Sequence, residues 1–502
     1  MTSRIARGRR APVCLITALA LVTAMTATAA TTTATATAVP AAAAPSRGAG
    51  SPGAAGTAQP PDPYYPELGN RGYDVDHYDV GIAYDPSSQR IDGDTKIEAT
   101  ATDRLRTLNL DFVGMDIESI SVDGKPAKHR RVGPELIVRP RTPIKADADF
   151  EVRVQYSGSP QPSELPGIGV PNGWLPTDDG VVTLNEPDGA RTVFPVNDHP
   201  TDKASYTFRL DVPKPLTAVA NGDLVSQDDH GDRTTFVWDA PAPMASYLSQ
   251  LAIGNLVIED AEAVDGVTIR HAFAPGIRDA AAAAATQTPE MLRYFTQWFG
   301  KFPFDTYGVL APDGGLQGLA FEAQTFSIFA PDVFASETQA SGILAHEMAH
   351  QWFGDWVSPA SWADTWLNEG FATYAEWLWG DATGGMALAP NAQSAYQRAS
   401  AEPDATAVDP GREGMFSGAV YDRGALTLHA LRLTVGDEPF AKILRTYLER
   451  YGGDTASTED LVAVASKVSG SDMTDFFASW LGPGEPPQLP AGDTGSVPPT
   501  TV

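Results

Sequence analysis

Apolar and polar residues alternate along the first half of the chain, which is the pattern of strands with one buried face. The clearest alternating runs are Tyr78-Val80-Ile82-Tyr84 and Val152-Val154-Tyr156. Val122-Asp123-Gly124-Lys125 lies between such runs and is typical of a hairpin turn. Short strands with frequent turn signals continue to about Ile258. We therefore expect an all-β domain over residues 62–258, a size usual for one domain.

Beyond this point the apolar spacing becomes that of helices. Between residues 280 and 299, Leu292, Phe295 and Phe299 recur at i, i+3 and i+7. Similar patterns cover residues 424–451 and 458–481. These patterns predict a mainly helical second domain over residues 259–484. The remaining residues, 485–502, are rich in proline and are expected to form a loose tail.

The amino-terminal residues have the composition of a targeting segment. Four arginines precede an apolar run over residues 11–25, and Ala27-Thr28-Ala29 follows as a small-residue cleavage site. The run is too short to span a membrane, so residues 1–29 are expected to be a secretory signal peptide. Arg9-Arg10 is a weak signal for the twin-arginine route. Residues 30–61 are mainly Ala, Thr, Pro, Gly and Ser, which predicts a disordered linker.

Cysteine usage and charge narrow the class of protein. Cys14, in the expected signal peptide, is the only cysteine of the 502 residues, so the secreted chain would have no disulfides. The formal net charge of −28 argues against nucleic acid and against anionic membrane surfaces as partners. We expect a secreted, extracellular protein with no stable membrane anchor.

The most specific chemical signal is His346-Glu347-Met348-Ala349-His350. Residues four apart on a helix project from the same face, so both imidazoles can bind one Zn²⁺. Glu347 would then lie beside the metal, where a carboxylate can take a proton from the attacking water. Glu369, in Trp366-Leu367-Asn368-Glu369-Gly370, is the expected third ligand, on a second helix after a turn at Ser358-Pro359. Two His and one Glu leave a position open, as in catalytic zinc sites.

This combination resembles the gluzincin zinc aminopeptidases of the aminopeptidase N family. The resemblance covers residues 64–481 and assigns one zinc per chain to His346, His350 and Glu369, with Glu347 as the general base. It implies a multidomain α+β fold, in which a saddle-like all-β domain precedes a mainly helical, thermolysin-like catalytic domain. Many members carry a further helical-repeat domain, which we do not expect in this chain.

Three further residues take their roles from the resemblance. Gly318-Leu319-Ala320-Phe321-Glu322-Ala323 is similar to the family's exopeptidase motif, although Phe321 replaces Met and Ala323 replaces Asn. By this similarity Glu322 binds the substrate's α-amino group. Glu186, in Asn185-Glu186-Pro187, matches a second acid at the same amine. Tyr421, in Tyr421-Asp422-Arg423-Gly424-Ala425, corresponds to the tyrosine that stabilises the oxyanion.

The resemblance therefore implies a secreted zinc metalloaminopeptidase that acts on peptides with a free amino terminus. Two alternatives stay open at this point. One is a zinc endopeptidase, or another zinc hydrolase, on the same scaffold. The other is a non-catalytic binding protein that keeps the fold, although a scaffold has no need of Glu347.

Overall fold

The structure, a computed structural model, describes residues 62–165, 167 and 169–492. The expected signal peptide, its cleavage site and the linker over residues 1–61 lie outside the described residues, as do residues 493–502. Within the described part of the chain, every helix is too short or too polar to cross a membrane.

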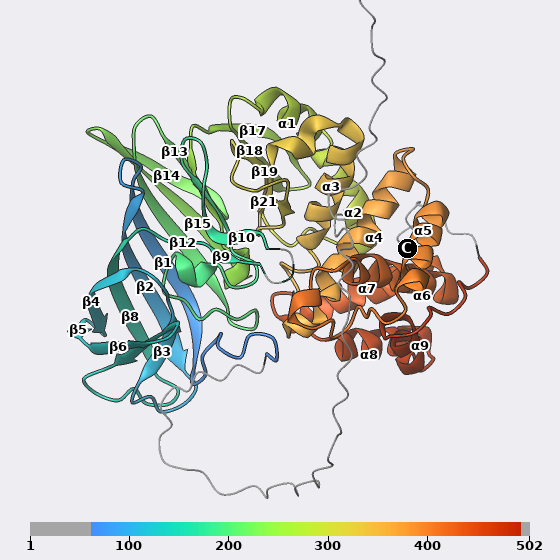
Figure 1. Cartoon of the computed structure of the whole chain (residues 1–502), viewed down its shortest axis with the longest axis horizontal. Helices are drawn as coiled ribbons and strands as arrows, with labels where there is room; N and C mark the ends of the chain where they lie inside the picture. Colours follow the sequence, from blue (N-terminus) through green and yellow to red (C-terminus); the bar gives the residue numbers. More distant parts are fainter. Residues whose placement is uncertain (1–61, 166, 168, 493–502) are drawn as a thin grey trace, which may run out of the picture. The chain divides into compact units, whose positions relative to one another are not determined.

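A large twisted sheet forms the centre of the first domain (Figure 1). The alternation of the sequence accounts for it: Tyr78, Val80 and Ile82 are buried on one face of β1, and their neighbours lie on the other. β1 pairs in parallel with β12 and antiparallel with β2. The strand order is β14 (Asp223–His230), β15 (Arg233–Ala245), β12 (Lys203–Pro213), β1 (Tyr73–Asp85), β2 (Arg90–Ala101), β8 (Asp149–Gly158), β4 (Asp116–Val122) and β5 (Lys125–Pro126).

The predicted hairpin turn is confirmed. Val122 pairs with Lys125, and Asp123 and Gly124 between them have φ values of 49° and 67°. Positive φ at both central residues is what a two-residue type I′ hairpin requires, and Asp-Gly supplies it at low cost.

Two smaller sheets complete the β domain. One has the order β13 (Thr217–Ala220), β16 (Leu251–Gly254), β11 (Val181–Leu184), β10 (Pro171–Pro176) and β9 (Ser163–Glu164). The other has the order β3 (Leu108–Asp111), β7 (Glu135–Arg139) and β6 (Lys128–Val132). The carboxyl end of β11 and the 3₁₀ turn η2 (Ser246–Leu248) before β16 supply residues that reach the second domain.

The second domain contains a five-stranded sheet that the helical patterns did not indicate. Its order is β17 (Val257–Val264), β18 (Val267–Phe273), β19 (Thr306–Ala311), β21 (Phe326–Phe329) and β20 (Ala320–Phe321). The boundary expected after residue 258 therefore falls inside β17. The inner strands β19 and β21 were missed because all of their residues are buried, which removes the alternation.

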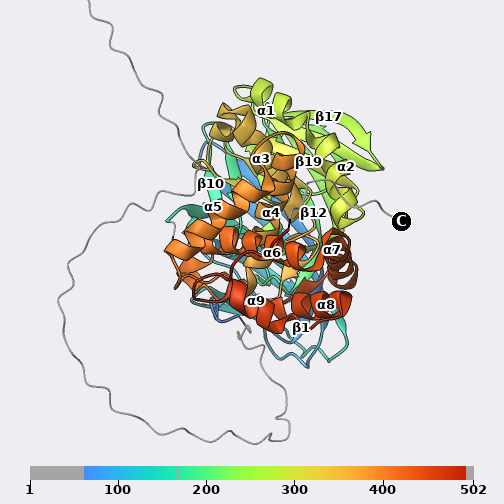
Figure 2. The ribbon, with the colours of Figure 1, turned by 90° about the vertical axis from the view of Figure 1, so that its right-hand side faces the viewer.

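Helices make up the rest of the second domain (Figure 1). They are α1 (Arg278–Ala285), α2 (Thr288–Phe299), α3 (Glu337–His350), α4 (Trp366–Ala382), α5 (Leu388–Ala401), α6 (Gly424–Val435), α7 (Asp437–Tyr451), α8 (Thr458–Ser469) and α9 (Thr474–Leu481). Helices α4 and α6 lie side by side (Figure 2).

Three predicted helical stretches are each divided into two helices. Gly436, at φ 88°, separates α6 from α7, and Gly470, at φ 74°, ends α8. A residue in this conformation stops the helical hydrogen-bond ladder. Pro289 is in the first turn of α2, where its missing N–H interrupts the stretch that begins with α1.

Two other expectations differ from the structure. Ser358-Pro359 is not a free turn, because it forms β22 (Ser358–Pro359), which pairs in parallel with β23 (Thr455–Ala456). The described part of the expected tail is not loose. Pro486 O accepts a hydrogen bond from Tyr396 Oη at 3.2 Å, and Leu489 packs against the core.

Candidate active site

The two histidines project from the last turn and a half of α3. Ser336 caps this helix by accepting a hydrogen bond from Gln339 N at 3.5 Å. The ring centroids of His346 and His350 are 4.8 Å apart. The spacing seen in the sequence thus places both imidazoles on one face, as predicted.

Glu369 comes from the first turn of α4 and completes a possible set of three ligands. Its Oε2 is 3.2 Å from His346 Nε2 and 3.5 Å from His350 Nε2. Ligand atoms about 2.0–2.2 Å from a tetrahedral zinc lie about 3.3 Å from each other. Both distances to the carboxylate oxygen match this spacing, and one ligand atom of each residue lies within 4.8 Å of the other two, so the three side chains could hold a zinc ion.

The other nitrogen of each imidazole faces a group that orients the ring. His350 Nδ1 is 3.1 Å from Phe353 O, and His346 Nδ1 is 3.8 Å from Glu376 Oε2. Such partners hold the ring so that Nε2 points to a metal. Sequence reasoning did not find Glu376. Its only signal is that it lies seven residues, or two helical turns, beyond Glu369 on the same helix face.

Glu347 is buried in the same cluster, 6% exposed. Its carboxylate groups with Glu322 and His350, with atoms of all three within 4.8 Å of one another. Burial raises the pKa of Glu347 to about 8, against the opposing effect of the two histidines. A carboxylate in such surroundings has high proton affinity, as a general base requires.

Glu186 and Glu322 reach the site from different domains. Glu186 follows β11 of the first domain, and Glu322 follows the edge strand β20 of the second. Carboxylate oxygens of Glu186, Glu322 and Glu369 lie within 4.8 Å of one another. Both Glu186 and Glu322 are buried, and Oε1 of each has no hydrogen-bond partner.

Hydrogen bonds fix the backbone on which these two acids stand. Gln351, just beyond α3, donates from Nε2 to Glu322 O at 3.0 Å and accepts from Thr325 N at 2.8 Å. Asn172 Nδ2 donates to Glu186 O at 3.0 Å. Neither Gln351 nor Asn172 had a recognisable signal in the sequence, because each acts only on a segment that folding brings to it.

Tyr421 lies on a π-helical turn, η6 (Ala419–Arg423), rather than at the start of a regular helix. Such turns are frequent at functional sites. Its ring stacks on His346 at 6.1 Å between centroids and 18° between planes. Burial, and then the surrounding acids, raise the pKa of Tyr421 well above its ordinary value, so the hydroxyl keeps its proton and can donate.

Two glycines allow Tyr421 and Glu369 to come together. A Cβ added to Gly370 would lie 2.9 Å from Gly424 Cα, and one added to Gly424 would lie 2.9 Å from Gly370 Cα. The backbones of α4 and α6 are thus in direct contact one residue from Glu369. Any side chain at either position would separate the two helices.

The cluster contains more buried carboxyl groups than buried cationic partners. Glu186, Glu322, Glu347, Glu369 and Asp355 are all buried, and both carboxylate oxygens of Asp355 have no hydrogen-bond partner. Burial alone would raise the pKa of Glu369, but the two histidines lower it to about 2. An unpaired buried acid is costly, so the site is built to receive cations.

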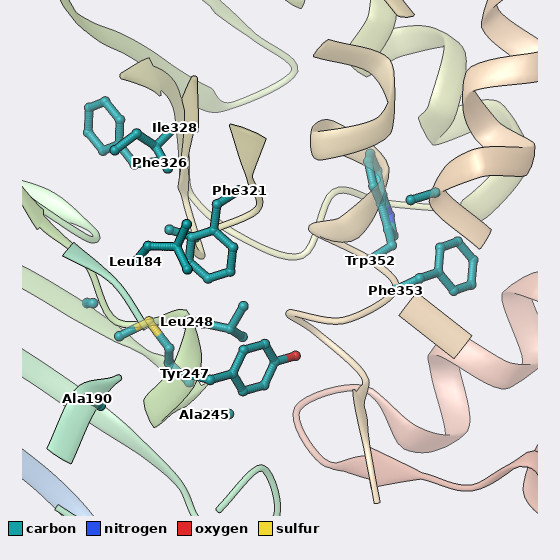
Figure 3. Close-up of a cluster of buried hydrophobic side chains, with 14 of the residues drawn as sticks. Leu184, Ala190, Ala245, Tyr247, Leu248, Phe321, Phe326, Ile328, Trp352 and Phe353 are labelled. Carbon is teal, nitrogen blue, oxygen red and sulfur yellow. The ribbon is translucent and has the colours of Figure 1, made fainter. Parts of the chain in front are cut away.

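Tyr247 of η2 links the first domain to the zinc-ligand segments. Its hydroxyl donates to Gly354 O at 2.9 Å and accepts from Asn368 Nδ2 at 3.3 Å. Figure 3 shows the side chain of Tyr247, with its hydroxyl, in a buried cluster that also contains Phe321 and Phe353. Because Asn368 precedes Glu369, this contact helps to fix the position of Glu369.

The structure thus brings together all seven residues that the sequence singled out. The Peptidase family M1 domain matches residues 283–480, and the Peptidase M1 N-terminal domain matches residues 74–248. The chain therefore belongs to peptidase family M1, whose fold, a β domain followed by a mainly helical catalytic domain, it shares.

Solved structures of similar chains exist. The M1 zinc metallopeptidase from Deinococcus radiodurans is 32% identical, with a TM-score of 0.80, and the match covers 86% of this chain and 99% of that one. A variant of that enzyme has been crystallised with a Tyr-Ser-Ala substrate, and it matches equally well, with a TM-score of 0.80.

Curated relatives are more distant and longer. Probable aminopeptidase 1 of Sulfurisphaera tokodaii is 28% identical over 74% of this chain and 49% of its own length. Aminopeptidase M1-B of Oryza sativa subsp. japonica is 28% identical over 60% of this chain and 36% of its own length. The matches thus span about half of these relatives or less.

Proposed function

We propose that the protein is a zinc aminopeptidase that removes single residues from the free amino terminus of peptides. The observation that carries the proposal is the pair Glu186 and Glu322. Both are buried beside the zinc-ligand set, and each has a carboxylate oxygen without a partner. A substrate ammonium group would satisfy both oxygens through charge-assisted hydrogen bonds.

One zinc ion per chain would be held by His346, His350 and Glu369. Zinc at such a site supplies Lewis-acid polarisation of the scissile carbonyl and makes water acidic enough to react near neutral pH. The distances between the three ligand atoms and the surplus of buried carboxylates support this assignment.

The chain's own groups would carry out the proton transfers and hold the reacting atoms. Glu347 takes a proton from the attacking water and delivers it to the leaving amine. Tyr421 donates a hydrogen bond to the oxyanion that develops on the carbonyl. Glu186 and Glu322 hold the ammonium group, which places the first peptide bond at Glu347 and fixes the cut one residue from the end.

A pair of peptides tests the position of the cut. The two would differ only in acetylation of the amino terminus, which removes the ammonium charge. The products are measured by mass spectrometry. We expect single residues to be lost stepwise from the free peptide alone. Equal cleavage of both peptides at internal bonds would instead establish a zinc endopeptidase. Failure to bind or cleave either peptide, with zinc bound, would favour another hydrolase or a binding protein.

Glu322→Gln separates the amine site from the rest of the machinery. The substitution keeps the shape and removes the charge, so we expect kcat/KM for the free peptide to fall by about 10–100-fold, the usual effect of losing a hydrogen bond to a charged group. Glu337→Gln, on the exposed start of α3, is the matched control and should retain wild-type kinetics. Equal kinetics of the two variants would remove Glu322 from the amine site.

We also propose that the protein is secreted. The arginines, the short apolar run and Ala27-Thr28-Ala29 support cleavage close to Ala30. Amino-terminal sequencing of protein from culture medium should find a chain that begins near this residue. A product that retains Met1 and sediments with membranes would contradict the proposal.

A further inference from the structure

The described chain begins with a short segment, residues 62–68, that we call the N-terminal strap. Asp62 is 2% exposed, and its carboxylate accepts four hydrogen bonds. Two come from Tyr64 N at 2.8 Å and Tyr65 N at 3.1 Å, within the strap. The other two come from Ser361 Oγ at 3.0 Å and Trp362 N at 2.7 Å. The strap is thus bound to the turn η4 (Trp362–Asp364), which leads into α4 and Glu369.

The two tyrosines of the strap contact the loop between α5 and η6. Tyr64 Oη donates to Asp409 Oδ1 at 2.6 Å and accepts from Gly411 N at 2.8 Å. The guanidinium group of Arg412 lies 4.3 Å above the ring of Tyr65, which is fully buried. A cation over an aromatic face is stabilising, most of all when the pair is partly desolvated.

The two residues that directly follow the strap, Gly69 and Asn70, are bound to the first domain. Gly69 N donates to Asp111 Oδ2 at 3.1 Å. Asn70 exchanges two hydrogen bonds with Asn197: its N donates to Asn197 Oδ1 at 2.6 Å, and its O accepts from Asn197 Nδ2 at 3.2 Å. The strap therefore connects the β domain to two separate segments of the catalytic domain.

From the strap, a series of hydrogen-bonded turns leads to Tyr421. Gly414 N donates to Gly411 O, Ser417 N to Gly414 O, and Val420 N to Ser417 O, each at 2.9 Å. Each turn begins at the residue where the previous one ends. Fixing Gly411 therefore fixes the direction from which the chain enters the π-helical turn that carries Tyr421.

We propose that the N-terminal strap is a positioning element of the active site, which acts on catalysis by holding Tyr421 at the oxyanion. The part of the inference that concerns catalysis rests on the proposed aminopeptidase function. The mechanical part, that the strap orders the loop between α5 and η6, stands on the contacts alone. Without the strap this loop would have to be ordered in each catalytic cycle, and misplacement by about 1 Å can lower a rate by about 100-fold.

A matched pair of tyrosine variants tests the mechanical part. Tyr64→Phe removes the two hydrogen bonds to the loop. Tyr73→Phe also removes a tyrosine hydroxyl, but one that donates to Asn109 O at 2.7 Å within the β domain. We expect amide hydrogen exchange of residues 409–420 to accelerate in Tyr64→Phe and to be unchanged in Tyr73→Phe. Equal exchange of this loop in both variants and the wild type would overturn the proposal, whatever the enzyme's activity.

Kinetics of the full-length protein test the catalytic part. Asp62→Ala should lower kcat by about 10–100-fold, and Tyr64→Phe by about 3–10-fold, with KM and zinc content nearly unchanged, because positioning rather than binding is lost. If Asp62→Ala does not fold, Tyr64→Phe carries the test. A rise in KM with constant kcat would assign the strap to substrate binding and contradict the proposal.

A double-mutant cycle distinguishes positioning from general destabilisation. Tyr421→Phe alone should lower kcat by about 100–1000-fold, the usual loss for one oxyanion donor. In that background Tyr64→Phe should have little further effect on kcat, because the hydroxyl that the strap positions is already absent. Fully multiplicative losses would show that the strap does not act through Tyr421. A wild-type protein without peptidase activity would refute the proposed function, and the exchange experiment would still decide the role of the strap.

Discussion

Among the residues that the structure describes, one group of buried acids forms the candidate active site, and another lies within the β domain. At the active site the acids lie around the two histidines. In the β domain they lie where loops meet the sheets. The members of the second group are Asp111, Glu135, Asp198 and Asp202, all buried.

The pKa values of the buried acids do not distinguish the two groups, because burial raises the pKa of acids in both. Burial, and then the neighbouring Glu135, raise the pKa of Asp111 to about 8. Burial raises the pKa of Asp198 to about 7 and that of Asp202 to about 8. Perturbed pKa values of this kind are often taken as a sign of function.

The side chains that lie beside the acids distinguish the two groups. Asp111 Oδ2 accepts from Gly69 N at 3.1 Å and from Asp198 N at 2.8 Å, and Asp198 accepts from Ser246 Oγ at 2.6 Å. These acids tie loops together. At the active site Glu186 and Glu322 leave oxygens unpartnered beside two imidazoles and a third carboxylate. Asp111 Oδ1 and both carboxylate oxygens of Glu135 lack hydrogen-bond partners as well, so neither unpartnered oxygens nor raised pKa values indicate a site by themselves. Among the described residues, the groups of His and acidic side chains that could hold a metal ion all lie at the active site, and this is what distinguishes it.

Of the predicted substitutions, removal of a proposed zinc ligand should lower activity the most. In His350→Ala we expect zinc to be lost and activity to become undetectable, since losing even a group that merely orients a ligand costs about 10–100-fold in metal affinity. Elemental analysis should find about one zinc per wild-type chain. A chelator should lower the melting temperature of the wild type, because zinc binds the folded state, and leave that of the variant unchanged. Stoichiometric zinc in His350→Ala would reject the ligand assignment.

Replacing the base should separate chemistry from metal binding. Glu347→Gln keeps the shape and the zinc but cannot take a proton, so kcat should fall by at least the factor of about 10²–10⁴ associated with general-base catalysis. Elemental analysis and steady-state kinetics on the same preparation check both expectations. Near-native kcat in zinc-loaded Glu347→Gln would assign the proton transfer to another group.

The smallest effect on activity is expected in the β-domain group. Asp111→Asn should leave kcat/KM within about twofold of wild type, because Asp111 touches no substrate and asparagine keeps an oxygen that can accept the hydrogen bond from Gly69 N. Its effect should appear in the pH dependence of stability. The unfolded-state pKa is about 3.9, below the folded value of about 8, so the stability that Asp111 contributes is fully present below about pH 4 and is lost as pH rises toward 8.

Thermal unfolding at several pH values checks this sign. Relative to wild type, Asp111→Asn should become more stable as pH rises from 5 to 8.5. Asp94→Asn is a control, because the hydrogen bond from Arg153 lowers the pKa of Asp94, so its contribution is lost only as pH falls below about 4 and its difference from wild type should be constant from pH 5 to 8.5. A loss of peptidase activity in Asp111→Asn at constant stability would show that the buried acids of the β domain also take part in function. The two groups would then no longer differ in role.

Much of the site could be predicted from the sequence because its strongest signals are local. The spacing of His346 and His350 fixes their common face through helix geometry alone. Glu369 was predicted from the need for a third ligand on a second helix beyond the histidines, whereas Glu322, Glu186 and Tyr421 were found through resemblance to a family. The alternation of apolar residues predicted the strands of the β domain, whereas β19 and β21 of the second domain are buried throughout and gave no alternating pattern.

What the sequence alone determined about this protein is therefore its local chemistry: strand faces, a hairpin turn, one helix with two imidazoles, and an acidic, disulfide-free chain. The tertiary structure decided which acids converge beside the two imidazoles, that Gly370 and Gly424 let two helices touch, and that Tyr421 stands on a π-helical turn. It also decided that Tyr247 and the strap cross between domains. The physical reason is the separation along the chain over which each interaction acts. Helix and strand periodicities act over a few residues, while these contacts join residues as far apart in the chain as Asp62 and Trp362.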